Sequence, residues 1–164
     1  MNTVSSALFV VLLALAGASS AHEDEHGKKR ASGKTAPPPQ ETAFGRAGNP
    51  GKVTRTVTVT MNDRMRFVPD HVVVRRGDTI RFLVKNEGRI MHEFVLGTMT
   101  DLKAHAELMR KHPGMEHEAP YMAHAAPGKS EAVVWQFTKP GEYHFACLMP
   151  GHFEAGMVGK IDAR

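Results

Sequence analysis

The spacing of three side chains near the C-terminus limits most strongly what this chain can fold into. The only cysteine, Cys147, is followed by His152 and Met157 in a C-x4-H-x4-M arrangement. A cysteine thiolate and two histidines with a weak axial methionine are the ligands of electron-transfer copper sites. We therefore expect a short loop between two strands that supplies three of the four ligands of such a site.

The second histidine must come from another part of the chain. His92 is the best candidate, because it lies at the start of the strand-like apolar run 91–96 and a second strand is needed to supply the other nitrogen. The alternative is that a buried cysteine, a histidine and a methionine coincide by chance, since a free cysteine often behaves as a small apolar residue.

The residues around the cysteine favour the metal site. Residues 143–147 alternate in a strand pattern that ends at Cys147. Pro150 and Gly151 then turn the chain, and residues 156–161 begin a final strand. The ligand types therefore lie on a loop between two strands, which is the context that a rigid metal site needs.

This segment resembles the ligand loop of the cupredoxins, the small β-sandwich family of plastocyanin, azurin and rusticyanin, and its spacing is most similar to the rusticyanin kind. The resemblance implies an all-β Greek-key sandwich in which His92, Cys147, His152 and Met157 bind one type 1 copper. In many cupredoxins an Asn follows the first copper histidine. Glu93 stands there in this chain, and its effect on the site is left open.

Alternating apolar residues predict about seven short strands separated by turns, which suits a two-sheet sandwich. A Gly77-Asp78 turn separates the second of these strands from the third, and we expect those two to pair in antiparallel fashion. The predicted strands are residues 53–61, 67–74, 79–86, 91–96, 132–137, 143–147 and 157–161.

A helix and a loop rich in methionine and histidine interrupt this pattern before the last strands. Asp101 is the predicted helix cap, and the helix should end before Pro113. Three Met/His pairs lie within residues 109–124, from the end of the helix into the loop, and thioethers with imidazoles suit Cu(I). The alternative is that the methionines are packed in the core and the histidines are solvated. The residues of this possible second Cu(I) site are Met109, His112, Met115, His117, Met122 and His124.

The same loop, together with the tract 147–157, resembles the periplasmic copper-tolerance cupredoxins of proteobacteria. That resemblance covers most of residues 55–162. It implies export and a role in copper handling.

The N-terminal third is predicted to lie outside the folded domain. Residues 1–21 have the apolar run and the small residues of a cleavable signal peptide, with a membrane anchor as the alternative. Residues 22–52 are polar and rich in Gly, Pro and Ala, which predicts a disordered linker. The cupredoxin domain is therefore expected at residues 53–163. Export to the periplasm without stable membrane insertion follows from these assignments.

The mature N-terminus is a weak Cu(II) candidate. His22 would carry the free amine after cleavage, and His26 lies close behind it among acidic residues. An unstructured acidic tag is the alternative. Two other histidines should not bind the copper, because His71 is expected to face solvent and His144 has the opposite strand parity to Cys147.

The charge does not indicate a nucleic-acid partner. The formal net charge is +4, and the basic residues are scattered, with a run at 28–30 in the predicted linker. One cysteine also excludes an intrachain disulfide. The expected partners are copper ions and a redox or copper-handling protein of the periplasm that the sequence does not name.

These patterns predict a periplasmic type 1 copper-binding redox protein that contributes to copper tolerance. A soluble electron carrier between respiratory complexes is the alternative. A copper oxidase or nitrite reductase would need additional His-x-His pairs or a His-Cys-His bridge, and the chain has neither around Cys147. We therefore do not expect an enzyme.

Overall fold

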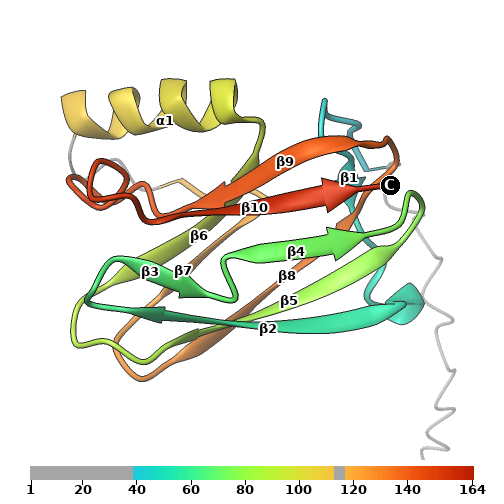
Figure 1. Cartoon of the computed structure of the whole chain (residues 1–164). Coiled ribbons are helices and arrows are strands. Elements are labelled where there is room, and N and C mark those ends of the chain that lie inside the picture. Colours follow the sequence, from blue (N-terminus) through green and yellow to red (C-terminus); the bar gives the residue numbers. More distant parts are fainter. Residues whose placement is uncertain (1–38, 113–116) are drawn as a thin grey trace, which may run out of the picture. The chain divides into compact units, whose positions relative to one another are not determined.

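The computed structural model describes residues 39–112 and 117–164. Ten strands form two five-stranded sheets. Figure 1 shows how these strands are arranged. The first sheet contains, in order, β1 (Arg46–Ala47), β8 (Ser130–Gln136), β5 (Thr79–Asn86), β2 (Arg55–Asn62) and β3 (Arg66–Val68). The second contains β4 (His71–Val74), β10 (Val158–Ala163), β9 (Gly141–Ala146), β6 (His92–Gly97) and β7 (Met122–Ala125). The prediction of an all-β sandwich is confirmed.

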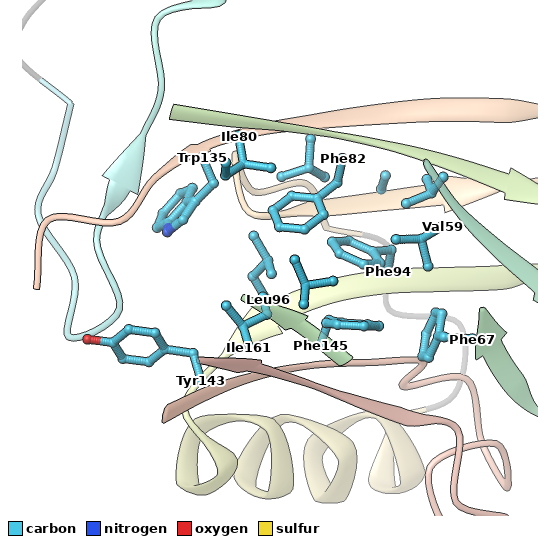
Figure 2. Close-up of a cluster of buried hydrophobic side chains, with 14 of the residues drawn as sticks. Val59, Phe67, Ile80, Phe82, Phe94, Leu96, Trp135, Tyr143, Phe145 and Ile161 are labelled. Carbon is cyan, nitrogen blue, oxygen red and sulfur yellow. The ribbon is translucent and has the colours of Figure 1, made fainter. Parts of the chain in front are cut away.

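The core lies between the two sheets. Strands such as β5 and β8 alternate buried and less buried residues, because successive side chains point to opposite faces of a sheet. In Figure 2, Phe82 of the first sheet points toward Phe94 of the second, and their ring centroids are 5.2 Å apart. Phe94 in turn stacks on Phe145 at 5.0 Å. This aromatic packing fixes β6, which carries His92, and β9, which leads directly to Cys147, against the opposite sheet.

The predicted antiparallel pairing of 67–74 with 79–86 is wrong. The run divides at Pro69 and Asp70 into β3, which pairs with β2 in the first sheet, and β4, which pairs in parallel with β10 in the second. β5 instead lies between β2, to which it is parallel, and β8. Proline has no N–H to donate to a ladder, so an uninterrupted strand through Pro69 is disfavoured and the chain changes sheet there.

The helix α1 (Met99–Lys111) packs on the outer side of the second sheet, against β6 and β9 (Figure 1). Its buried residues, Leu102, Ala106 and Met109, recur at helical spacing on one face. The predicted position of the helix, before the last strands, is confirmed, but its N-cap is Thr98 rather than Asp101. The Thr98 hydroxyl oxygen accepts the Asp101 backbone N–H at 3.2 Å and donates to the Asp101 carboxylate at 2.6 Å.

The folded unit begins earlier than the predicted boundary at residue 53. Phe44 is only 6% exposed and stacks on Trp135 with ring centroids 5.1 Å apart. The Trp135 indole N–H donates to the Phe44 carbonyl at 2.9 Å, and β1 pairs with β8. A short 3-10 helix at Pro50–Lys52 leads from β1 into β2. Sequence composition missed this segment because one buried aromatic residue and a two-residue strand leave no periodic pattern.

The predicted signal peptide, the linker up to residue 38, His22, His26 and Met115 lie outside the described residues. Among the residues that are described, no helix is long and apolar enough to cross a membrane.

Candidate metal centre

Three of the predicted copper ligands come together at one end of the sandwich. The Nδ1 atoms of His92 and His152 lie 3.9 Å and 3.2 Å from the Sγ atom of Cys147. The three ligand atoms all lie within 4.8 Å of one another. In the described part of the chain, no other group of three or more His, Cys, Asp or Glu side chains has its ligand atoms this close.

Neighbouring strands bring these residues together. β6 and β9 are antiparallel neighbours, with Val95 opposite Ala146, so His92 at the start of β6 lies close to Cys147 just beyond the end of β9. His152 lies on the loop that connects β9 to β10. The pairing register of β6 and β9 therefore brings together His92 and Cys147, which are far apart in the sequence.

The loop carrying the other ligands closes through its own backbone hydrogen bonds. The Cys147 N–H donates to the Met157 carbonyl at 3.1 Å, and the Met157 N–H donates to the His152 carbonyl at 3.1 Å. Gly151 makes the turn with φ of 87°, a left-handed conformation that glycine adopts without strain. Met157 is fully buried in the same core cluster as Cys147, which is the placement that the predicted axial ligand requires.

Burial controls the protonation of two ligands. It raises the pKa of the Cys147 thiol to about 12, while backbone hydrogen bonds from Glu93 and Met149 act in the opposite direction. The thiol therefore keeps its proton at neutral pH until a metal replaces that proton. Burial, assisted by the neighbouring His92, lowers the pKa of His152. A neutral imidazole is the form that binds a metal.

Asp63 lies beside His92 on the side away from Cys147, and the sequence analysis did not identify it. Its Oδ1 atom lies 3.4 Å from His92 Nε2, although this contact lacks the alignment of a hydrogen bond. The Arg89 backbone N–H donates to both carboxylate oxygens of Asp63 and is the main cause of the lowered pKa of that carboxyl group. A carboxylate behind a ligating imidazole fixes which nitrogen faces the metal. Nothing in the local sequence connects Asp63 with His92.

Glu93, the departure from the usual cupredoxin pattern, has two separate roles in the structure. Its backbone N–H donates to Cys147 Sγ at 3.3 Å. Its side chain is buried, and Oε1 lies 3.2 Å from Nε2 of His124 on the neighbouring strand β7. The contact to the sulfur thus uses the backbone and does not depend on the identity of the side chain.

The residues of the predicted Cu(I) site are placed in different surroundings. Met109 and Met122 are both buried in an apolar cluster that also includes Leu102 and Leu148. His112 is the exposed C-cap of α1, whereas His124 contacts Glu93. His117 lies beside His105, with ring centroids 4.6 Å apart. The structure therefore brings the two described methionines together, in packing that also suits a purely structural role.

The two histidines that we expected to lie away from the copper do so. The exposed His71 ring lies 2.8 Å from the Asp162 carboxylate, and His144 lies 3.5 Å from Glu142.

The donor set fits copper. A cysteine sulfur and two imidazoles whose ligand atoms lie within 4.8 Å of one another, with a buried thioether on the same loop, match the ligand preference of type 1 copper better than that of hard cations. Copper bound there would be held by His92, Cys147 and His152, with Met157 available as the axial ligand.

Comparison with known proteins agrees with this chemistry. Residues 53–164 match the family of copper binding proteins described as the plastocyanin/azurin family. A protein of Rubrivivax gelatinosus named copper-resistant cuproprotein CopI is 56% identical over 124 residues, which cover 76% of this chain and 75% of that protein. A protein of the same name from Pseudomonas aeruginosa is 32% identical over 187 residues, covering 94% and 93%.

Solved structures agree on the fold. Reduced auracyanin from Roseiflexus castenholzii has a TM-score of 0.57 at 22% identity and covers 68% of this chain and 98% of its own. Auracyanin B has a TM-score of 0.59 at 20% identity, covering 76% and 96%. With the family match over residues 53–164 and the convergence of His92, Cys147 and His152, this chain belongs to the plastocyanin/azurin family of copper-binding proteins and has the cupredoxin fold.

Proposed function

We propose that this chain is a periplasmic type 1 copper protein that contributes to copper tolerance by binding copper and cycling it between its two oxidation states. The observation that carries the proposal is the convergence of His92, Cys147 and His152 at one end of a rigid sandwich. The relatives named copper-resistant cuproprotein support the link to copper stress. The predicted signal peptide at residues 1–21 supports the location.

Bound copper supplies one-electron chemistry at this site, and the chain controls access to it. The side chains of His92, Cys147 and Met157 are fully buried, so water is kept from most of the site. His152 is the only one of the four that is partly exposed. Its loop is therefore the route by which electrons or copper reach the site. Strand β6 and the end of β9 position His92 and Cys147, and the backbone hydrogen bonds of the loop position His152 and Met157, which limits rearrangement between oxidation states.

A soluble electron carrier is the second candidate, and one surface feature favours it. Ile90 and Met91, which directly precede the ligand His92, are 42% and 39% exposed. Exposed apolar side chains beside a buried redox site suit transient docking of a protein partner. The two candidates share the copper site and differ in what docks on it.

Growth of a deletion strain separates these candidates. Under copper stress, the wild-type gene should restore growth and a gene encoding Cys147→Ser should not, while respiratory flux without added copper should be unchanged by the deletion. Impaired flux with normal copper tolerance would favour the electron carrier instead. Full rescue by Cys147→Ser would show that tolerance does not need this site.

An additional Cu(I) site in the Met/His loop is a separate part of the proposal. The burial of Met109 and Met122 in one cluster supports only their proximity. In a Cys147→Ser background, replacing Met109, Met115 and Met122 with Leu keeps apolar bulk and removes sulfur. Unchanged Cu(I) stoichiometry and affinity in that variant would assign these methionines to packing.

A further inference from the structure

A second pair of imidazoles lies outside the copper centre. His105 is on α1, and His117 is on the segment that leads toward β7. Their ring centroids are 4.6 Å apart and their planes are inclined by 50°. The corresponding values for the two copper-site histidines, His92 and His152, are 5.0 Å and 52°. The two pairs of rings therefore have a similar centroid separation and a similar inclination.

The pair lines an open groove between α1 and the segment before β7. Asp101, His105, Leu108, His117 and Tyr121 contribute to its walls. Asp101 lies one helical turn before His105, so both side chains project from the same face of α1. Both histidines are partly exposed. Solvent can therefore reach the rings and complete a coordination sphere, and the nearby carboxylate favours a cation.

The protonation states suit ligation. Burial, followed by the charge of His117, lowers the pKa of His105. The lowered pKa favours the neutral form of His105, which is the form that binds a metal. His117 Nδ1 is buried and has no hydrogen-bond partner among the described residues. An unpartnered buried nitrogen is unfavourable, and a metal bound at the pair would satisfy a ring nitrogen.

We propose that His105 and His117 form a second metal site, separate from the type 1 centre, that binds Cu(II) at the protein surface. Imidazoles without sulfur suit borderline divalent ions, and Cu(II) binds such sites more tightly than Zn(II) does. The site shares His117 with the predicted Cu(I) site but adds His105, uses no methionine and takes the oxidised ion. It does not depend on the proposed role in copper tolerance.

Zn(II) titration of the copper-loaded protein tests the site, because the visible band of the type 1 centre reports that the first site stays filled. The titration is done by calorimetry on the full mature chain carrying His22→Ala and His26→Ala, which removes the predicted N-terminal chelator. In that background we compare His105→Gln, His117→Gln and the double variant. His71→Gln is the matched control, since His71 is an exposed histidine that contacts a carboxylate on a distant strand.

The chain that carries only His22→Ala and His26→Ala, the parent, should bind about one further Zn(II). His105→Gln and His117→Gln should each weaken this binding at least about tenfold, because loss of a metal ligand costs no less affinity than loss of a residue that supports a ligand. His71→Gln should bind as the parent does. With added Cu(II), electron paramagnetic resonance should show a second signal with splitting from imidazole nitrogen, absent in the double variant. The site would be overturned if the double variant bound Zn(II) as tightly as the parent, or if His71→Gln weakened binding as much as His105→Gln and His117→Gln do.

A measurement on the unsubstituted chain tests the site even if the variants fold poorly. The imidazole resonances of His105 and His117 should shift together as Zn(II) is added to the copper-loaded protein. If Zn(II) binds and both sets of resonances stay in place, the two rings are not ligands.

Discussion

The backbone N–H of Glu93 donates a hydrogen bond to the Sγ atom of Cys147 over 3.3 Å. This bond connects the strand that carries the first ligand, His92, to the residue that supplies the thiolate. A donor aimed at sulfur favours the charged form, which partly offsets the effect of burial on the thiol. The link survives the replacement of the usual Asn by Glu because the donor belongs to the backbone.

Cys147→Ser should abolish the intense visible band of the Cu(II) protein, because that band arises from charge transfer from a thiolate to copper. His92→Ala should bleach or strongly perturb the same band. His144→Ala is the control and should leave it unchanged, since His144 contacts Glu142 rather than the ligands. Absorption spectra of the three purified variants decide this. A band that persists in Cys147→Ser would refute the assignment of the thiolate.

Met157→Leu should retain copper and raise the reduction potential, whereas Met157→Gln should lower it, because the axial ligand tunes the relative stability of Cu(I) and Cu(II). Each tenfold change in the ratio of the two affinities moves the potential by about 59 mV. Voltammetry measures this shift. If neither variant shifts the potential, Met157 is not a ligand and Met149 becomes the candidate.

Arg66→Ala should loosen the ligand loop. The Arg66 guanidinium donates to the carbonyls of Met65 and Ala155 at 2.8 Å and 3.0 Å, the latter just before Met157. Loss of these bonds should cost about 1 kcal/mol of unfolding free energy and speed copper release.

Arg55→Ala is the matched control for this loop. Arg55 also donates from an exposed guanidinium to a carbonyl, that of Val73, but far from the ligands. It should lower stability similarly and leave copper release unchanged. Equal release rates in the two variants would show that Arg66 does not position the loop.

Phe44→Ala should destabilise the domain by about 3 kcal/mol, because it removes a buried ring that stacks on Trp135. Val68→Ala, at a side chain that is 54% exposed, should change stability by less than about 0.5 kcal/mol. Urea unfolding of both variants measures the difference. Similar effects in the two would mean that the segment before residue 53 adds little to the fold.

Acid should destabilise the protein partly through the ionised groups on β9 and β10. Hydrogen bonds from His71 and Lys160 lower the pKa values of Asp162 and Glu142, respectively. A carboxyl group with a lowered folded-state pKa stabilises the fold above its ordinary range and loses that contribution as pH falls through the folded value. Urea unfolding below about pH 5 should therefore show a weaker pH dependence for Asp162→Asn than for the wild-type chain. If the unfolding free energy changed with pH equally in both proteins, Asp162 would not contribute to the acid destabilisation.

The ligand loop could be predicted from the sequence because its information is local. Cys147, His152 and Met157 lie on one short stretch, and their residue types match a single kind of site. Alternating apolar residues likewise mark where strands occur, because the side-chain period of a strand is set by its own backbone. The helix was predictable for the same reason.

Tertiary structure alone decided which strands pair and which side chains meet. Periodicity shows which face of a strand is buried but not which strand lies beside it. Pro69 marks a break in the run 67–74, but only the folded chain shows that its two halves join different sheets. Asp63 behind His92 and the His105–His117 pair are contacts between segments that only folding brings together. The sequence by itself determined the chemistry of the ligands, and long-range packing determined their support, their exposure and their neighbours.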